Sequence, residues 1–137
     1  MTLTFLDAGV LIAAYHGLPS EAEPALALLR DKTRAFVSSP FLWLETMPKA
    51  LYYRNTSEIA FYNHYFETKV KISIDDVVAI TRVAREEGRR CGLGAMDALH
   101  VAAAHLAEAD ELITTEKPGR AIHKASLVRV VYLAPAG

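Results

Sequence analysis

One continuous stretch, residues 93–116, constrains the fold more than any other part of the sequence. Small and apolar residues recur through 95–109 at the spacing of one helix face, so a helix here can approach its packing partner closely. Residues 111–115 are mostly apolar or β-branched, which is typical of a short strand. A helix that leads into a buried strand is the repeating unit of α/β folds with a mainly parallel sheet.

Two acidic residues flank this helix–strand unit. Asp97 lies in the first turn of the expected helix, where the helix dipole and the free N–H groups favour a negative charge. Glu116 directly follows the expected strand, and ligands of α/β proteins bind at the carboxyl ends of strands. Both carboxylates are therefore candidates for a binding or catalytic site.

Strands and helices are expected to alternate along the rest of the 137 residues. The other expected strands cover 3–6, 35–38 and 128–133, and the other expected helices cover 8–15, a segment from Ser20, a segment from Pro40, 57–68, 76–90 and part of 118–124. The expected helix caps are Ser20, Ser57 and Asp75. Pro48 is expected to kink or end the helix that begins at Pro40. The alternation predicts an α/β protein, a three-layer α/β/α sandwich with a mainly parallel central sheet, formed by residues 1–137 as one domain.

One isolated acid follows the first expected strand, and another lies on an apolar helix. Asp7 separates strand 3–6 from the next helix, and a helix cap explains this position as well as a functional role does. Glu45 lies among apolar residues, where a charge is costly unless it is paired or binds a cation. In a parallel α/β sheet these two acids would converge with Asp97 and Glu116 on one cleft.

Four carboxylates in one cleft repel one another and favour either protonation or the binding of a cation. Oxygen ligands favour a hard ion, Mg²⁺ or Mn²⁺, over zinc, and a water bound to such an ion can be activated to attack a phosphodiester. His100 and His105 are five residues apart and do not share a helix face, so they do not form a zinc pair. His100 lies one turn from Asp97 and is a candidate catalytic residue, although a packed or solvent-exposed histidine is the more common outcome.

The composition limits the partners and the compartment of the protein. The formal net charge is −1, so nucleic-acid binding would need a local basic patch. Arg85, Arg89 and Arg90 on the expected helix 76–90 are candidates for RNA binding through phosphates, and a solvated helix end is the alternative. The single cysteine, Cys91, excludes a disulfide framework, and no apolar stretch reaches the roughly 18 residues of a membrane helix. A cytoplasmic location without membrane contact is therefore expected.

Four blocks of the sequence, in their order and spacing, resemble one known family. They are Leu6-Asp-Ala-Gly-Val-Leu-Ile12, the isolated Glu45, Met96-Asp-Ala-Leu-His-Val-Ala-Ala-Ala104 and Leu112-Ile-Thr-Thr-Glu116. The family is that of the PIN domains, and the resemblance is closest to the VapC-like toxins of toxin–antitoxin pairs. It implies a PIN-like fold, a Mg²⁺- or Mn²⁺-dependent endoribonuclease that acts on RNA, a cognate antitoxin partner and a homodimer.

The resemblance also assigns roles to individual residues. The acidic positions that bind metal and catalyse match Asp7, Glu45, Asp97 and Glu116, and the supporting hydroxyl matches Thr114. Gly9 stands where the family often has Asn or Ser, so one polar contact is absent. Glu116 stands where Asp or Asn is usual, so its side chain is one methylene longer.

Two other functions compete with this interpretation. A catalytically degenerate PIN module would bind RNA or protein without cleavage, but clustered acids are costly to retain without a metal role. A phosphotransferase with Asp7 as nucleophile generally needs a second acid two residues later, and that position is Gly9.

The antitoxin is expected to occupy a groove formed partly by residues 41–66. The aromatic residues of this region are Phe41, Trp43, Tyr52, Tyr53, Phe61, Tyr62, Tyr65 and Phe66. One domain of this size buries only some of them, and exposed aromatic side chains mark interfaces. A basic side chain of the partner could also reach the acids. Filling of the core, or contact between two copies of the chain, explains these aromatics equally well.

Overall fold

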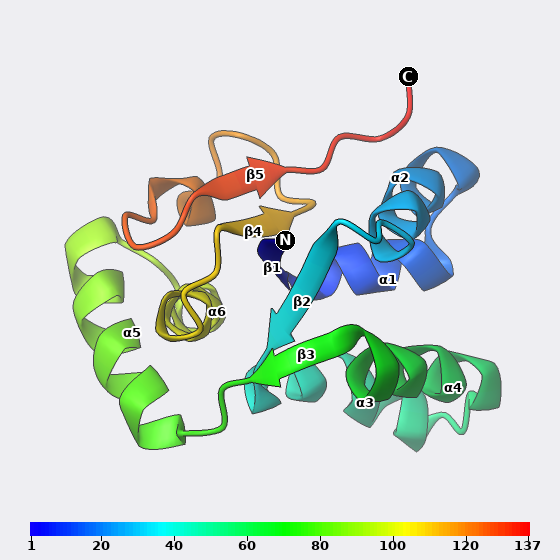
Figure 1. The fold of residues 1–137 in the computed structure, drawn as a ribbon, viewed down its shortest axis with the longest axis horizontal. Helices are drawn as coiled ribbons and strands as arrows, with labels where there is room; N and C mark the ends of the chain where they lie inside the picture. Colours follow the sequence, from blue (N-terminus) through cyan, green and yellow to red (C-terminus); the bar gives the residue numbers. More distant parts are fainter.

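A five-stranded, entirely parallel sheet forms the centre of the computed structural model, which describes residues 1–137 (Figure 1). The strands are β1 (Thr2–Leu6), β2 (Arg34–Ser38), β3 (Val70–Ser73), β4 (Glu111–Thr114) and β5 (Val130–Tyr132). Their order across the sheet is β3-β2-β1-β4-β5, so β1 is central and the carboxyl ends of all strands meet at one edge.

Helices cover both faces of this sheet, which confirms the predicted three-layer α/β/α fold (Figure 1). One face packs against α1 (Ala8–His16), α2 (Pro19–Leu29), α3 (Pro40–Tyr52) and α4 (Thr56–His64), and the other against α5 (Val77–Cys91) and α6 (Ala95–Leu106). A π-helical turn follows α4 at Tyr65–Lys69, and a 3₁₀ turn covers Ala121–Lys124. None of these helices combines the length and the hydropathy needed to span a membrane.

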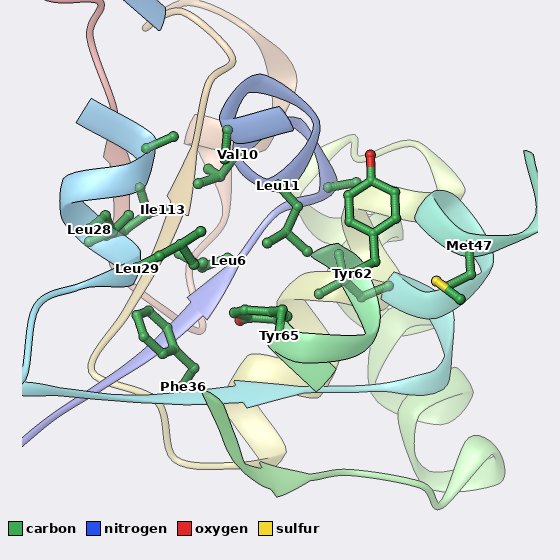
Figure 2. Close-up of a cluster of buried hydrophobic side chains, with 14 of the residues drawn as sticks. Leu6, Val10, Leu11, Leu28, Leu29, Phe36, Met47, Tyr62, Tyr65 and Ile113 are labelled. Atoms are coloured by element: carbon green, nitrogen blue, oxygen red, sulfur yellow. The ribbon is translucent and has the colours of Figure 1, made fainter. Parts of the chain in front are cut away.

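Alternating side chains of the strands divide the core into two halves. On β1, Phe5 points to the α5–α6 face and Leu6 to the opposite face, and both are fully buried. Leu11 and the aromatic rings of Tyr62 and Tyr65 pack with Leu6 in the larger half (Figure 2). Each fully buried side chain of this size stabilises the fold by roughly 1.5–3 kcal/mol. The core therefore fixes the positions of β1 and α1, from which the first candidate site residue extends.

Alanines let α6 lie close to the sheet, as the helical spacing of small residues predicts. Ala102, Ala103 and Ala104 are fully buried, as is Val101 on the same helix. A side chain of one carbon leaves little distance between the helix backbone and the strands. Asp97 lies in the first turn of this closely packed helix, which contacts β1, β2 and β4.

Two features of the fold differ from the sequence-based expectation. The edge strand β3 was not expected, because Lys71 and Ile72 are both exposed and the strand therefore lacks a periodic apolar pattern. Pro48 does not end α3, which continues to Tyr52. Proline removes one backbone hydrogen bond, and burial of Met47 and Ala50 on either side of it keeps this helix against the core.

The helix caps lie one or two residues from their expected positions. Asn55, not Ser57, caps α4, and Asp76, not Asp75, caps α5; each side chain accepts a hydrogen bond from a backbone N–H in the first turn. Ser20 lies inside α2, because Pro19 already occupies the first turn of that helix. Neighbouring polar residues compete for a cap, and the local sequence does not decide between them.

Candidate metal centre

The parallel pairing of β1 with β4 brings the first and the last candidate acids together. Leu6 pairs with Ile113, and the next N–H, that of Asp7, donates a hydrogen bond of 2.9 Å to the carbonyl of Ile113. Glu116 lies two residues beyond the end of β4. Both acids therefore leave the carboxyl edge of the sheet from adjacent strands, as the sequence order predicts.

Asp7 occupies the N-cap position of α1, but its carboxylate does not cap the helix. Instead, Oδ2 accepts a hydrogen bond of 2.8 Å from the hydroxyl of Thr114 on β4, and the side chain is 9% exposed. The same hydroxyl accepts a hydrogen bond of 3.0 Å from the backbone N–H of Glu116. Thr114 thus links the two acids and fixes the orientation of the Asp7 carboxylate.

Glu45 of α3 and His100 of α6 meet from the two faces of the sheet. Nε2 of His100 and Oε1 of Glu45 form a hydrogen bond; the imidazole is 1% exposed, and the carboxylate side chain is 33% exposed. One carboxylate oxygen of Asp7, one of Glu45 and one nitrogen of His100 lie within 4.8 Å of one another. The structure therefore adds an imidazole to the carboxylates predicted from the sequence.

The pKa of the fourth acid, Asp97, is affected by the same cluster. Its burial raises the pKa of its carboxyl above the usual range, and repulsion from Asp7, Glu116 and Glu45 raises it further, whereas His100 acts in the opposite sense. Asp97 and Glu116 lie outside the group of atoms within 4.8 Å. The acids therefore form an inner pair, Asp7 and Glu45, and an outer pair.

Glu116 differs from the other acids because a cation already contacts it. Nε of Arg120 lies 3.2 Å from Oε2 of Glu116, and the two side chains are 71% and 45% exposed, respectively. An ion pair this exposed is weak, so it leaves Glu116 able to turn toward the cluster.

The donor set of this edge fits a divalent cation. Carboxylate oxygens gather around partly buried space, and ionisation of Asp97 is disfavoured by its neighbours, a repulsion that a bound cation would relieve. Mg²⁺ and Mn²⁺ accept such oxygen ligands. The residues that would hold the ion are Asp7 and Glu45. Asp97 and Glu116 lie outside this group, and the repulsion that raises the pKa of Asp97 shows that their charges act on the same site.

The missing polar side chain at position 9 has a steric explanation. A Cβ atom placed on Gly9 would lie 2.2 Å from Oγ1 of Thr115. The Thr115 hydroxyl therefore occupies the space that a larger residue at position 9 would need, and any such residue would require Thr115 to rotate.

The expected basic patch on α5 is divided by its ion pairs. Arg89 pairs with Glu86 at 2.6 Å, and Arg90 pairs with the buried Glu87 at 2.8 Å. Arg90 also donates a hydrogen bond of 2.8 Å to Ser126, so its side chain helps to hold the fold together. Arg85 and Arg89 line a groove together with the first turn of α6. These two arginines are therefore the better candidates for phosphate contact.

The aromatic region at residues 41–66 separates into a buried and an exposed part. Tyr62 and Tyr65 are buried, and burial raises the pKa of the Tyr65 hydroxyl, which has no hydrogen-bond partner. The exposed apolar side chains all lie at α3 and just after it, and we call them the α3 surface: Trp43, Leu44, Leu51, Tyr52 and Tyr53. One of the expected explanations, that these aromatic side chains fill the core, therefore holds for Tyr62 in α4 and for Tyr65 in the turn that follows it.

The sequence made His100 a candidate catalytic residue, because it lies three residues after Asp97 on one face of α6. The sequence did not predict that this imidazole would join Asp7 and Glu45 in the inner group. Its contact with Glu45 spans 55 residues of sequence and depends on how α3 and α6 pack. No local pattern reports a contact of that separation.

Comparisons with known proteins agree with this architecture. The family model described as PIN domain matches residues 4–118. A comparison with curated proteins finds no match.

Three solved structures are similar to this fold. VapBC2 from Rickettsia felis bound to a DNA fragment from their promoter gives a TM-score of 0.69 at 16% identity, covering 96% of this chain and 98% of that chain. FitAcB from Neisseria gonorrhoeae gives a TM-score of 0.58 at 18% identity, covering 93% of this chain and 95% of that chain. A toxin–antitoxin complex from Klebsiella pneumoniae gives a TM-score of 0.56 at 21% identity, covering 82% of this chain and 86% of that chain. At these identities the likeness is one of fold.

Proposed function

We propose that this chain, which belongs to the PIN domain family, is a divalent-metal-dependent endoribonuclease and the toxin of a toxin–antitoxin pair. The observation that carries the proposal is the convergence of Asp7, Glu45, Asp97 and Glu116 at the carboxyl edge of the sheet. Such a cluster is costly to maintain unless it binds a cation. PIN nucleases usually use divalent metals, and Mg²⁺ or Mn²⁺ suits this donor set.

Different residues of the chain would bind the metal, orient a ligand and accept a proton during hydrolysis. A bound divalent ion would polarise a coordinated water and offset the negative charge that develops on the attacked phosphate. Asp7 and Glu45 would hold the ion, and the Thr114 hydroxyl keeps the Asp7 carboxylate in place. Asp97, whose pKa is already raised, is suited to accept a proton from the attacking water.

The substrate is RNA, which the resemblance to VapC-like toxins implies. With a net charge of −1, the chain must contact phosphates through a local patch. Arg85 and Arg89 supply this patch in the groove beside the first turn of α6. Because Asp97 lies in that same turn, RNA held by the arginines would pass near the acids.

The antitoxin would bind at the α3 surface. Tyr52 is 79% and Tyr53 70% exposed, and their rings pack edge to face with centroids 5.0 Å apart. Trp43, 39% exposed, lies on the same helix as Glu45, so a partner that covers the surface could pair a basic side chain with this carboxylate. The structures of similar fold include a toxin–antitoxin complex from Klebsiella pneumoniae, which supports an antitoxin over a second copy of this chain as the occupant.

The experiment that tests catalysis also separates it from RNA binding alone, which is the function of a degenerate PIN module. Purified protein is incubated with total RNA in Mg²⁺, in Mn²⁺ and in EDTA, and both cleavage and binding are measured. Cleavage should require a metal and should be absent from the Asp97→Asn variant. The exposed acid Asp75 lies outside the cluster, so Asp75→Asn is the matched control and should cleave normally. Binding without metal-dependent cleavage would favour the degenerate module.

The partner is tested separately by co-expression with the neighbouring open reading frame and by pull-down. A small protein should copurify with the wild type and be lost when Tyr52 and Tyr53 are both replaced by Ser. A chain that associates only with itself, and whose expression alone does not arrest growth, would contradict the assignment as a toxin. Nuclease activity could survive that result.

A further inference from the structure

His100 is the buried polar residue of the site that the four acids do not account for. Its ring packs against Phe5, with ring centroids 5.4 Å apart, and its side chain is 1% exposed. Nε2 faces Glu45, whereas Nδ1 is buried without a hydrogen-bond partner. Burying a polar nitrogen without a partner costs free energy, which points to a use of this ring beyond packing.

The distances around Nε2 fit a single ion. One ring nitrogen of His100 and one oxygen each from Asp7 and Glu45 lie within 4.8 Å of one another, and Nε2 is the ring nitrogen that contacts Glu45. Ligand atoms that lie about 2.0–2.3 Å from one divalent ion are at most about 4.6 Å apart, so these three atoms need little movement to surround it. No oxygen of Asp97 or Glu116 belongs to a group this tight.

We propose that Nε2 of His100 is a ligand of the divalent ion, beside the carboxylate oxygens of Asp7 and Glu45. This inference rests on the metal centre of the proposed function but not on RNA cleavage. In this state the lone pair of Nε2 faces the ion, and the ring proton lies on Nδ1. Glu45, which now contacts Nε2, turns its oxygen from the imidazole to the ion.

A nitrogen ligand changes which metal the site prefers. Mg²⁺ is a hard ion that keeps oxygen ligands and several waters, whereas imidazole suits the first-row transition ions. The site should therefore bind Mn²⁺ more tightly than Mg²⁺. Removal of the imidazole should weaken Mn²⁺ binding by about tenfold or more and change Mg²⁺ binding much less.

The first test needs no substitution. Mn²⁺ is bound to the unaltered protein in the absence of RNA, and pulsed electron paramagnetic resonance records nitrogen coupling to the metal. Protein labelled with ¹⁵N only in histidine should show ¹⁵N coupling of the strength of direct coordination in place of ¹⁴N coupling. The absence of histidine coupling in Mn²⁺-loaded protein would overturn the inference, and retained RNA cleavage in the same sample would leave the nuclease assignment intact.

The second test identifies which histidine is responsible. His100→Phe keeps a buried ring against Phe5, and His100→Gln keeps a hydrogen-bonding group toward Glu45; both should lose the nitrogen coupling and the preference for Mn²⁺. His105→Gln, on the exposed side of the same helix, should retain both. Circular dichroism in EDTA verifies that each variant is folded. An unchanged ratio of Mn²⁺ to Mg²⁺ affinity in both His100 variants would mean that His100 only positions Glu45, and the inference would be wrong.

Discussion

Replacing Glu87 by Gln should destabilise the fold strongly, although Glu87 is not one of the four clustered acids. Glu87 is fully buried near the end of α5. Its Oε2 accepts hydrogen bonds of 2.8 and 3.0 Å from the backbone N–H groups of Ser126 and Leu127, and its Oε1 lies 2.8 Å from Arg90 and from the Ser126 hydroxyl. In a glutamine, an NH₂ group would replace one of the two carboxylate oxygens. The donors that this oxygen now serves would then have no acceptor.

The magnitude follows from the pKa of this carboxyl. Burial by itself would raise the pKa of Glu87, but the hydrogen bonds from Arg90, Ser126 and Leu127 outweigh it and lower the pKa from 4.5 to about 2. At 1.36 kcal/mol per pKa unit the difference corresponds to about 3 kcal/mol. Because the Arg90 side chain is 51% exposed, solvent screening reduces the expected contribution to about 2 kcal/mol.

The sign of the pH dependence is fixed by the lowered pKa. The unfolded chain takes up the proton before the folded chain does, so the stabilisation is complete above pH 4.5 and is lost as the pH falls toward 2. Glu87→Gln should therefore lower the free energy of unfolding by about 2 kcal/mol at pH 7, and the melting temperature by about 5–10 °C. Between pH 4.5 and 2, the free energy of unfolding should therefore fall less steeply in the variant than in the wild type, because the variant has no carboxylate to protonate at this position.

Urea unfolding at several pH values measures both quantities. The matched control is Glu86→Gln, because Glu86 is 60% exposed and pairs with the exposed Arg89, so its loss should change stability little. Equal unfolding midpoints for the two variants at pH 7 would refute the argument. A slope of stability against pH that is the same in Glu87→Gln as in the wild type would refute it too.

Three further outcomes are expected. Asp97→Asn should stabilise the metal-free protein at pH 7, because the raised pKa of Asp97 means that its ionisation lowers the stability of the fold as the pH rises. Thermal unfolding in EDTA measures this effect, and equal or lower stability of the variant would contradict the repulsion among the acids. Arg85→Ala should weaken RNA binding and reduce the slope of log affinity against log salt by about one, as measured by titration at several salt concentrations; an unchanged slope would leave this arginine a solvated residue. Thr114→Val removes the hydroxyl that links Asp7 to Glu116 and should weaken Mn²⁺ binding by about tenfold or more in calorimetry; unchanged affinity would mean that Asp7 is oriented without it.

The parts of the fold that could be predicted from the sequence are those that depend on the spacing of residues within one helix or one strand. The alanines of α6 recur at helical spacing, and β4 follows them as a short run of apolar and β-branched residues, so both elements were predicted. The order of strands and acids then placed Asp7 and Glu116 at one edge of the sheet. By contrast, β3 is an edge strand that carries exposed side chains such as Lys71, so its sequence lacks the alternation of apolar and polar residues that would indicate a strand.

Contacts between distant elements account for what the sequence did not predict. His100 meets Glu45 only because α3 and α6 pack across the edge of the sheet. Arg90 was expected to contact phosphates, but it lies beside the buried Glu87 and binds Ser126, which is 36 residues away in sequence. Both cases depend on tertiary packing, which residue spacing within one helix does not report.

The most direct test of the central claim is a time course of cleavage of one structured RNA by metal-depleted protein, before and after Mn²⁺ is added back. Cleavage is expected to be absent in EDTA and rapid after addition of Mn²⁺. The Asp7→Asn variant should cleave under neither condition, and circular dichroism should show that it is folded. Cleavage that continues in EDTA, or that Asp7→Asn carries out at the wild-type rate, would contradict the assignment of the four acids as a metal-dependent nuclease centre.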